Sequence, residues 1–366
     1  MAKTVSSPAV ETFAAGIETA VDVAAIEKEL HELWHAVAET QPGSPERQIA
    51  RASLFNFVVF CRTEAHRDHA TQVLSTLTSY HPCRAMVLVV DPESPKPQLS
   101  AAISAHCHLA AERKQVCCEQ ITFHASGTDV ENLSATVLPL LESDLPTVVW
   151  WQYNFLQSVV VFRQLVDAAD QIIYDTSSWD APENQFGALA EIIAARQHSK
   201  FADLSWTRLG LWRELAADFF DDPSCRAKLN SVRAVEIEHG CGPGAAVRAE
   251  LLASWFAAQL QWPAAEALAK IRLTEREDRD VTAVGIISFV IRASDARFSV
   301  RKDHGELAAS AVVEMPNVCS LPRKQAFRPA DDASLLSQEL DRASNPFIYE
   351  RALRMASQLF GRAGKI

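Results

Sequence analysis

The stretch Leu-Phe-Asn-Phe-Val-Val-Phe-Cys, residues 54–61, and the stretch Ala-Met-Val-Leu-Val-Val, residues 85–90, decide the fold class. Both are short and almost continuously apolar, without the alternation of a strand that faces water on one side. Such strands are buried on both faces, which is typical of a parallel sheet covered by helices. A helix expected from Thr63 to about Ser79 separates them, and this order favours a right-handed strand–helix–strand unit.

The alternation of strands and helices continues on both sides of this unit. Asp22 is a suitable N-cap for a helix whose apolar residues recur at helical spacing. Further expected elements are a hairpin-like pair at Ala101–Ala110 and Val116–Phe123, strands at Thr147–Trp151 and Ile172–Asp175, and helices at Asp129–Glu142, Phe155–Ala169 and Phe186–Gln197. We therefore predict a flexible N-terminal arm over residues 1–21 and an N-terminal α/β domain over residues 22–200, with a mostly parallel sheet flanked by helices.

The second half of the chain has a different pattern. Consecutive strands are expected at Thr282–Arg292, Arg297–Lys302 and Leu307–Glu314, and Asp303-His304-Gly305 supplies turn chemistry between the last two. Further expected elements are helices at Trp206–Phe220, Ala245–Leu260, Asp332–Arg342 and Pro346–Phe360 and a strand at Val232–Glu238. We predict a C-terminal mixed α/β domain with antiparallel strands over residues 201–366.

Composition limits the classes of partner. The chain has 366 residues, 48% of them hydrophobic, and a formal net charge of -11. Nucleic acids and anionic membranes require a basic face, so neither is an expected partner. No apolar segment is long enough to cross a bilayer, and the N-terminus lacks the pattern of a signal peptide. The eight cysteines include no C-x-x-C pair. We therefore expect a cytoplasmic protein with reduced thiols.

A glycine-rich turn is the strongest candidate for binding a small molecule. Gly240-Cys-Gly-Pro-Gly-Ala245 follows a predicted strand and precedes a predicted helix, so it formally matches G-x-G-x-x-A. Free N–H groups at such a helix start can bind a phosphate, which makes Gly240, Gly242 and Gly244 anion-site candidates. The turn has no P-loop lysine, and no strand ending in an acid follows about twenty residues later. A purely structural strand-to-helix turn is the competing interpretation.

Histidine and cysteine pairs do not form a recognisable metal site. His106 and His108 alternate with Cys107 on an expected strand, so all three cannot bind one ion, and an edge-strand or solvated pair is the simpler reading. His66 and His69 have metal-compatible spacing on a helix, but no H-E-x-x-H pattern is present. The vicinal Cys117-Cys118 pair is expected to pack on both sides of a strand. We predict no metal and no cofactor.

The search for catalytic residues finds no G-x-S-x-G elbow and no carboxylate pair that stands out from the general acidity. What remains are short sequence segments rich in tryptophan and arginine, the residue types enriched in protein-interface hot spots. They occur around Arg84, around Trp150-Trp151, and at the start of the second domain, where Trp206, Arg208, Trp212 and Arg213 are candidate partner contacts. Burial of these tryptophans in the core is the alternative.

The same sequence segments carry a resemblance to a known family. In chain order they are Arg51-Ala52 with Leu54-Phe55-Asn56, His81-Pro82-Cys83-Arg84-Ala85, Glu119-Gln120-Ile121, Leu145-Pro146 with Trp150-Trp151, Asp203-Leu204-Ser205-Trp206-Thr207-Arg208 with Trp212-Arg213, Glu250-Leu251-Leu252-Ala253-Ser254-Trp255 with Leu260-Gln261-Trp262, and Tyr349-Glu350-Arg351-Ala352-Leu353. Their order over residues 51–353 resembles the glucose-6-phosphate dehydrogenase assembly protein family, known as OpcA.

The resemblance implies a non-catalytic protein that binds glucose-6-phosphate dehydrogenase and promotes its active oligomeric state in the oxidative pentose phosphate pathway. Such a partner acts by linkage, because it shifts a population toward the form that it binds better. The alternative is a nucleotide- or sugar-phosphate-binding enzyme or sensor that uses the Gly240–Ala245 turn, and a third reading is a metal-dependent protein that uses His106 and His108.

Overall fold

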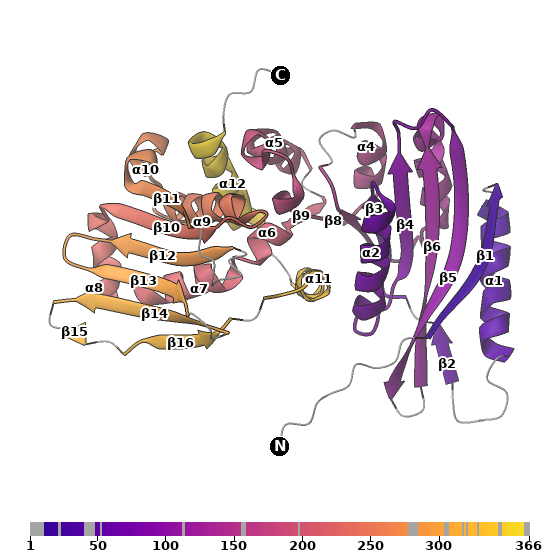
Figure 1. Cartoon of the computed structure of the whole chain (residues 1–366), viewed down its shortest axis with the longest axis horizontal. Coiled ribbons are helices and arrows are strands. Elements are labelled where there is room, and N and C mark those ends of the chain that lie inside the picture. Colours follow the sequence, from indigo (N-terminus) through magenta and orange to yellow (C-terminus); the bar gives the residue numbers. More distant parts are fainter. Residues whose placement is uncertain are drawn as a thin grey trace. The chain divides into compact units, whose positions relative to one another are not determined.

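The computed structural model (Figure 1) describes the chain except residues 1–10, 21–22, 40–47, 52, 112–113, 155–158, 197, 277–284, 304–306, 317, 320, 328, 343–345 and 362–366. Two compact units make up the molecule. The first comprises residues 1–174, 198–201 and 332–341, and the second comprises residues 175–197, 202–331 and 342–366. The chain therefore passes from the first unit to the second three times: after Tyr174 and after Phe201, at or close to the ends of two neighbouring strands, and after Asp341.

A nine-stranded sheet forms the centre of the first unit, in the order β1-β5-β6-β4-β3-β7-β8-β9, with β2 beside β6. Its strands are β1 (Glu11–Ala20), β2 (Gln48–Arg51), β3 (Asn56–Cys61), β4 (Arg84–Asp91), β5 (Gln98–Ala111), β6 (Lys114–Ser126), β7 (Thr147–Trp151), β8 (Gln171–Tyr174) and β9 (Lys200–Asp203). The pairs β6–β4, β4–β3, β3–β7 and β7–β8 are parallel, and β5 joins β6 antiparallel. The expected mostly parallel sheet and the expected hairpin-like pair are confirmed.

The helices of the first unit are α1 (Val23–Glu39), α2 (Glu64–Leu77), α3 (Leu133–Val137), α4 (Val159–Asp167) and α11 (Asp332–Asp341). Helix α2 packs on β3 and β4, α11 packs against α2, and α1 packs against β1 and β5 (Figure 1). The hydroxyl of Thr63 accepts a hydrogen bond from the backbone N–H of His66, which is the expected N-cap of α2. Six consecutive residues of β3 are buried, as a covered parallel strand requires.

The tryptophans of β7 lie inside the first unit. Trp150 is 2% exposed and Trp151 is 0% exposed. The ring of Trp151 stacks on Phe60 with 3.9 Å between ring centroids, and the ring of Trp150 lies parallel to that of Phe57 at 6.3 Å. These two tryptophans are core residues and cannot serve as partner contacts, because a buried ring has no surface to offer.

Two sequence-based expectations for the first unit are wrong. Residues 11–20 form β1, which pairs antiparallel with β5, whereas a flexible arm was expected there; the pairing provides ladder partners for this edge of β5. Residues 1–10 of that arm lie outside the described residues. The second wrong expectation is that His106 lies on an edge strand or in solvent. His106 is 3% exposed and its Nε2 lies 3.1 Å from Oε1 of Gln120, so it is a buried, hydrogen-bonded histidine of an interior strand.

A seven-stranded mixed sheet forms the centre of the second unit, in the order β11-β10-β12-β13-β14-β15, with β16 beside β14. Its strands are β10 (Ala234–Gly240), β11 (Ile271–Arg276), β12 (Ile286–Arg292), β13 (Arg297–Lys302), β14 (Ala308–Met315), β15 (Val318–Cys319) and β16 (Arg323–Ala326). The pair β10–β11 is parallel and the other pairs are antiparallel. This confirms the expected mixed α/β architecture with antiparallel strands.

The helices of the second unit are α5 (Phe186–Ala195), α6 (Leu204–Thr207), α7 (Gly210–Asp218), α8 (Pro223–Arg226), α9 (Ala245–Gln259), α10 (Ala264–Lys270) and α12 (Pro346–Phe360). Helix α9 packs on β10, β11 and β12, and α12 packs against α9 and α5. Aromatic rings fill the space between helix and sheet: Phe256 of α9 lies 5.8 Å from Phe289 of β12, and Phe220 lies 5.0 Å from Phe298 of β13. This core holds α9 in place.

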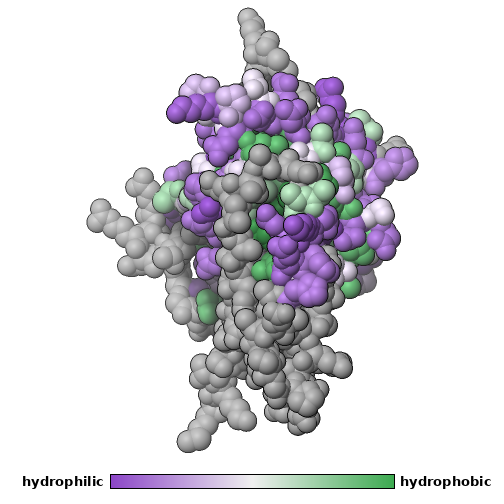
Figure 2. Space-filling view, turned by 90° about the vertical axis from the view of Figure 1, so that its right-hand side faces the viewer, coloured by the Kyte–Doolittle hydropathy of each residue, from purple (hydrophilic) through white to green (hydrophobic). Residues whose placement is uncertain are grey.

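Among the described residues, no helix combines the length and apolarity that crossing a membrane requires. On the face shown in Figure 2, hydrophilic side chains cover most of the described surface, and smaller hydrophobic areas lie between them.

Candidate functional site

The four candidate contact residues at the start of the second unit have different environments. Trp212 is 2% exposed and packs edge-on against Phe327, with 6.0 Å between ring centroids. It is therefore a core residue, and the expectation that it contacts a partner does not fit its burial. Trp206, Arg208 and Arg213 are each half-buried and reach the surface. Leu209 and Leu215, expected on the core-facing stripe, are each 1% exposed.

Trp206 and Arg213 form one stacked pair. The guanidinium carbon of Arg213 lies 3.5 Å from the centroid of the Trp206 ring. Nη2 of Arg213 also donates to the carbonyl oxygen of Trp206 at 3.2 Å, and Nε donates to that of Leu209 at 3.4 Å. The Trp206 ring also contacts the ring of Tyr349 of α12, with 5.3 Å between the ring centroids. These contacts fix the arginine over the ring, so the pair is a pre-formed surface element.

Arg208 is held by an internal ion pair. Its Nη1 lies 2.5 Å from Oδ2 of Asp175, the residue that follows β8. The other carboxylate oxygen of Asp175 accepts hydrogen bonds from the hydroxyls of Ser177 and Ser205, at 2.6 and 2.7 Å. Burial alone would raise the pKa of Asp175, but the Arg208 charge and the two serines outweigh it and hold this pKa below its usual value.

Asp203, the last residue of β9, is a second buried carboxylate beside the first. Oδ1 accepts from the backbone N–H of Thr176 and Ser205, and Oδ2 accepts from the hydroxyls of Thr176 and Tyr349. Burial and the neighbouring Asp175 charge raise the pKa of Asp203 to about 7. Because four donors already surround Asp203, the carboxylate links η4 (Thr176–Ser178), Ser205 and Tyr349 of α12 within the second unit rather than presenting a free catalytic group.

Sequence reasoning missed this carboxylate pair, although a signal was present. Asp175-Thr-Ser177 and Asp203-Leu-Ser205 are both Asp-x-Ser words, and each stands at the carboxyl end of a strand. In each word the aspartate accepts a hydrogen bond from the serine N–H two residues later, at 3.0 and 2.9 Å. Carboxyl ends of neighbouring strands in α/β sheets are where polar groups converge. The repeated word therefore predicts the cluster.

The glycine-rich turn packs directly against this cluster. Gly244 is the N-cap of α9 with φ of 68°, and a Cβ built on it would lie 2.0 Å from Cβ of Ser177. Only a glycine allows η4 to approach so closely, which gives the structural interpretation of the turn a physical reason. The backbone N–H of Ala245 donates to the carbonyl of Gly242 at 3.1 Å, and Gly240 ends β10. The turn thus lies beside Ser177, whose hydroxyl donates a hydrogen bond to Asp175, the carboxylate that pairs with Arg208.

Arg248 of α9 was not singled out from the sequence, yet it belongs to the same cluster. It is 5% exposed, and its Nη2 donates to the carbonyl oxygen of Pro243 at 2.9 Å. Burial and the neighbouring Arg208 charge lower the pKa of Arg248, while Asp175 and Asp203 raise it. The structure therefore brings together a glycine of the turn, Arg208 and a buried second arginine.

Exposed apolar side chains stand at the start of α12. Phe347 is 59% exposed and Ile348 is 38% exposed. The guanidinium carbon of Arg351 lies 5.6 Å from the centroid of the Phe347 ring, and Arg351 also donates to the carbonyl of Ala258. Tyr349, which contacts Trp206, follows directly in the chain. We use the name aromatic–arginine surface for Trp206, Arg213, Phe347 and Ile348, the half-buried or exposed side chains of α6, α7 and the start of α12.

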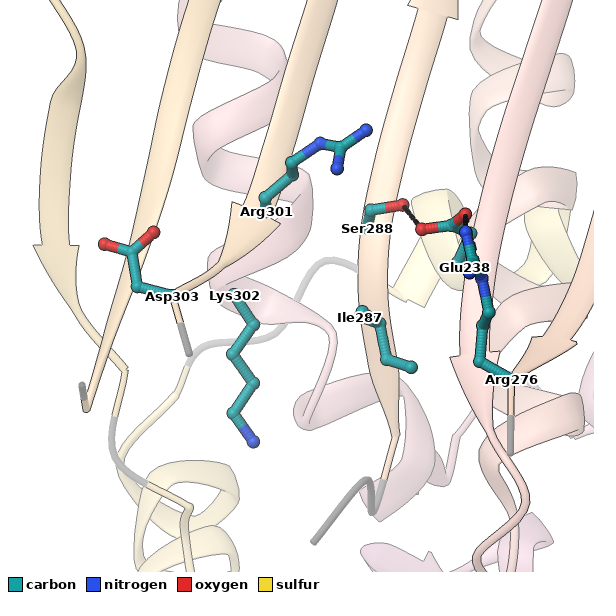
Figure 3. Close-up of a pocket in the computed structure, with 7 residues that line it drawn as sticks. All are labelled: Glu238, Arg276, Ile287, Ser288, Arg301, Lys302 and Asp303. Carbon is teal, nitrogen blue, oxygen red and sulfur yellow. Dashed lines mark hydrogen bonds and ion pairs between the residues drawn. The ribbon is translucent and has the colours of Figure 1, made fainter. Parts of the chain in front are cut away.

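A separate hollow of about 300 Å³ lies on the second sheet. It is lined by Glu238, Arg276, Ile287, Ser288, Arg301, Lys302 and Asp303 (Figure 3). Glu238 accepts from Nη2 of Arg276 at 2.5 Å and from the hydroxyl of Ser288 at 2.8 Å, and Asp303 accepts from Ser310 at 2.8 Å. The carboxylates of this hollow are therefore already engaged within the sheet.

In the part of the chain that the structure describes, no group of three or more His, Cys, Asp and Glu side chains is arranged to hold a metal ion. His69 instead lies 3.5 Å from Asp332, an ion-pair distance in the first unit. Burial raises the pKa of the Cys61 thiol to about 12 and that of Cys118 to about 11, which makes these thiols unreactive at neutral pH.

Comparison with known proteins finds a family whose models match two stretches of this chain. Residues 75–191 match the model of the OpcA family described as "Glucose-6-phosphate dehydrogenase subunit N-terminal domain". Residues 199–353 match the companion model, whose description names the C-terminal domain of the same glucose-6-phosphate dehydrogenase subunit. The first match ends within α5 and the second begins just before β9, and together they cover most of the chain.

Three cyanobacterial relatives carry the name "Putative OxPP cycle protein OpcA". The chain is 30% identical to the protein of Synechocystis over 52% of its length, 32% identical to that of Synechococcus elongatus over 54%, and 29% identical to that of Nostoc punctiforme over 57%. These matches span 39%, 44% and 43% of the relatives' own length, so the chain corresponds to less than half of each.

Solved structures of similar arrangement include the aldose-aldose oxidoreductase of Caulobacter crescentus, with a TM-score of 0.43 and 9% identity over 85% of this chain and 98% of that one. A second is the oxidoreductase YvaA of Bacillus subtilis, with a TM-score of 0.40 and 7% identity over 83% and 96% of the two chains. Likenesses at this level carry no argument about activity. The matching N- and C-terminal domain models and the named relatives show that the chain belongs to the OpcA family.

Proposed function

We propose that this protein binds glucose-6-phosphate dehydrogenase, favours the assembled and active form of that enzyme, and has no dehydrogenase activity of its own. The observation that carries the proposal is the two-part family match over residues 75–191 and 199–353, since both descriptions name this enzyme.

Activation of this kind needs only a difference in affinity. A protein that binds the assembled enzyme more tightly than its separate protomers stabilises the assembly by that difference, about 1.4 kcal/mol for each tenfold ratio. Reciprocity follows: conditions that favour the assembled enzyme must also tighten binding of this protein.

The aromatic–arginine surface is the contact region that we propose in the second unit. Phe347 and Ile348 present apolar area at 59% and 38% exposure, and the stacked Trp206–Arg213 pair adds a fixed aromatic and a cation. Exposed aromatic and arginine side chains with low residual mobility are the typical centre of a protein interface. Arg208 is set apart from this surface, because its guanidinium already binds Asp175.

The first experiment is a steady-state assay of the enzyme with and without this protein, run beside sedimentation analysis of the enzyme's oligomeric state. We expect a larger oligomer and a higher kcat or lower KM when the protein is present, and no activity from the protein alone. Unchanged kcat, KM and oligomer size would refute the proposal.

Alanine variants test whether the aromatic–arginine surface binds the enzyme. Phe347→Ala and Arg213→Ala each remove a side chain of the aromatic–arginine surface and are expected to weaken binding about 30-fold, corresponding to about 2 kcal/mol for a hot-spot residue. Leu321→Ala, at an 89% exposed position, and Arg226→Ala, whose side chain also bonds backbone carbonyls, are the matched controls. Equal affinity of all four variants would move the interface elsewhere.

A further inference from the structure

The buried arginine of α9 has too few acceptors for its charge. A guanidinium has five N–H donors, and Arg248 uses one of them, from Nη2 to the carbonyl oxygen of Pro243. Among the described residues, Nε and Nη1 have no hydrogen-bond acceptor. Only 5% of the residue is exposed, but Nε and Nη1 are not among the fully buried atoms without a partner, so a solute can reach them. Buried cations are ordinarily paired, so an under-partnered one indicates a missing acceptor.

The charges around Arg248 point to a negative acceptor. Arg208 is a neighbouring cation, close enough to lower the pKa of Arg248. Asp175 is ionised but already engaged by Arg208, and Asp203 has a pKa of about 7, so it carries only part of a charge at neutral pH. The N-terminus of α9, which begins at Ala245, adds the positive end of a helix dipole.

The structure leaves room at one edge of the guanidinium. A Cβ built on Gly285, whose φ is 114°, would lie 3.6 Å from Nε and 3.9 Å from Nη2 of Arg248. Among the residues that the structure describes, and apart from the chain neighbours of the glycine, no other heavy atom comes within 4 Å of that point. Nε and Nη2 form the edge with which arginine makes two parallel hydrogen bonds to an oxyanion. The space that Gly285 leaves therefore lies at the edge suited to binding.

We infer that the Nε–Nη2 edge of Arg248, beside Gly285 and the start of α9, binds a compact oxyanion, either a phosphate or a carboxylate group. Each oxygen would accept one N–H of the fork, and the Nη2 proton that is not used by Pro243 would complete the pair. Arg208 and the helix N-terminus contribute charge without direct contact. This inference does not depend on the proposed partner, because it concerns the chain alone.

Calorimetric titration of the purified full chain with inorganic phosphate tests the site, with ionic strength held constant by chloride. We expect saturable binding of one phosphate per chain. Arg248→Gln removes the charge and the fork, and Gly285→Ala places a methyl group in the open space while leaving every charge in place. Each is expected to weaken binding at least tenfold. Absence of saturable binding to the wild type, or equal affinity in wild type and both variants, would overturn the inference.

Gly127→Ala is the control for the strain of substituting a glycine. Gly127 also has a positive φ, 56°, but lies in the first unit against Ser94 and Lys96. It should bind phosphate as the wild type does, and thermal melts confirm which variants are folded at the titration temperature. If Arg248→Gln does not fold, Gly285→Ala and Arg248→Lys, which keeps the charge and loses the fork, carry the test. Weakening in Gly127→Ala equal to that in Gly285→Ala would also contradict the inference.

Acetate titrated in the same way separates the two oxyanion classes. Tighter phosphate binding would assign the site to a phosphoryl group, and tighter acetate binding would assign it to a carboxylate. If chloride competes equally with both, the site has no preference for two oxygens and the inference fails. Loss of phosphate binding with intact enzyme activation, or the reverse, distinguishes this site from the proposed partner role.

Discussion

Each unit of the molecule contains a buried arginine, and the two differ in their partners. Arg84 of β4 is 3% exposed and lies 2.6 Å from Glu27, 2.7 Å from Glu142 and 2.9 Å from Glu119. Two of these contacts are hydrogen bonds, whereas the contact from Nε to Glu119 is an ion pair without hydrogen-bond alignment. Arg248 of α9 is 5% exposed and makes one hydrogen bond, to a backbone carbonyl.

This difference separates a structural arginine from a candidate binding residue. Around Arg84, three carboxylates more than balance one cation, so the group is complete and has no need of a ligand. Around Arg248, a second arginine stands close by and the nearest ionised carboxylate belongs to that second arginine. Burial alone does not identify a site; the balance of charges and hydrogen bonds does.

The largest effect is expected from breaking the complete network. Arg84→Ala would leave Glu119, which is 1% exposed and also accepts from Nε1 of Trp34, as a buried charge without its cation. Removing one partner of a buried pair typically costs about 3–5 kcal/mol. Urea unfolding of the variant measures this loss. Arg323→Ala, which breaks an exposed pair with Asp218, is the control and should change stability little. A loss as small as that of the control would mean that the network is not stabilising.

The sequence determined the architecture of both units better than it determined the exposure of particular side chains. Continuous apolar runs predicted β3 and β4 as covered strands, and their burial confirms this. The segment around Arg84 was interpreted as a possible partner contact because arginine is enriched in protein-interface hot spots. Its burial depends on Glu27, Glu119 and Glu142, which are far from it in the sequence, and no local pattern reports such partners.

The same limit applies to the candidate site. The glycine turn and Arg208 were each recognised from their own words, but nothing local says that Ser177 lies between them. Arg248 follows three residues after the turn in a mostly apolar helix, which was available as a signal: a charged residue on a helix that is buried on nearly every side must face an acceptor. Trp212 shows the opposite error, since an interface-prone residue type was in fact core.

A pH-dependent effect of intermediate size is expected on another face of α9. Burial, with a contribution from Glu183, raises the pKa of Glu250 to about 7, and its Oε2 is buried without a hydrogen-bond partner in the described part of the chain. The folded protein therefore keeps a proton that the unfolded chain releases near pH 4.5. Stability should fall as pH rises from about 4.5 through about 7, by up to about 3 kcal/mol from this group.

Glu250→Gln removes that proton exchange and should flatten the decline in urea-unfolding free energy measured from pH 5 to pH 8. A residual slope of the same sign is expected from Asp203, whose pKa is raised to about 7 as well. Glu131→Gln, at an exposed position of the first unit, is the control and should keep the wild-type slope. An unchanged slope in Glu250→Gln would show that Glu250 is ionised in the folded protein at neutral pH.

The smallest change in unfolding free energy is expected for Arg248→Gln, the variant that compares most directly with Arg84→Ala. Arg248→Gln deletes a buried charge that has no carboxylate of its own, so the desolvation penalty of the wild-type cation disappears together with its one hydrogen bond. The glutamine amide can still donate toward Pro243, and we expect the free energy of unfolding in phosphate-free buffer to change by about 1 kcal/mol or less. Urea unfolding beside Arg84→Ala makes the measurement. In phosphate the wild type alone should gain stability, because only it binds the ion. A loss in Arg248→Gln as large as that in Arg84→Ala would show that Asp175 and Asp203 already balance Arg248, and the two arginines would then be equivalent structural residues.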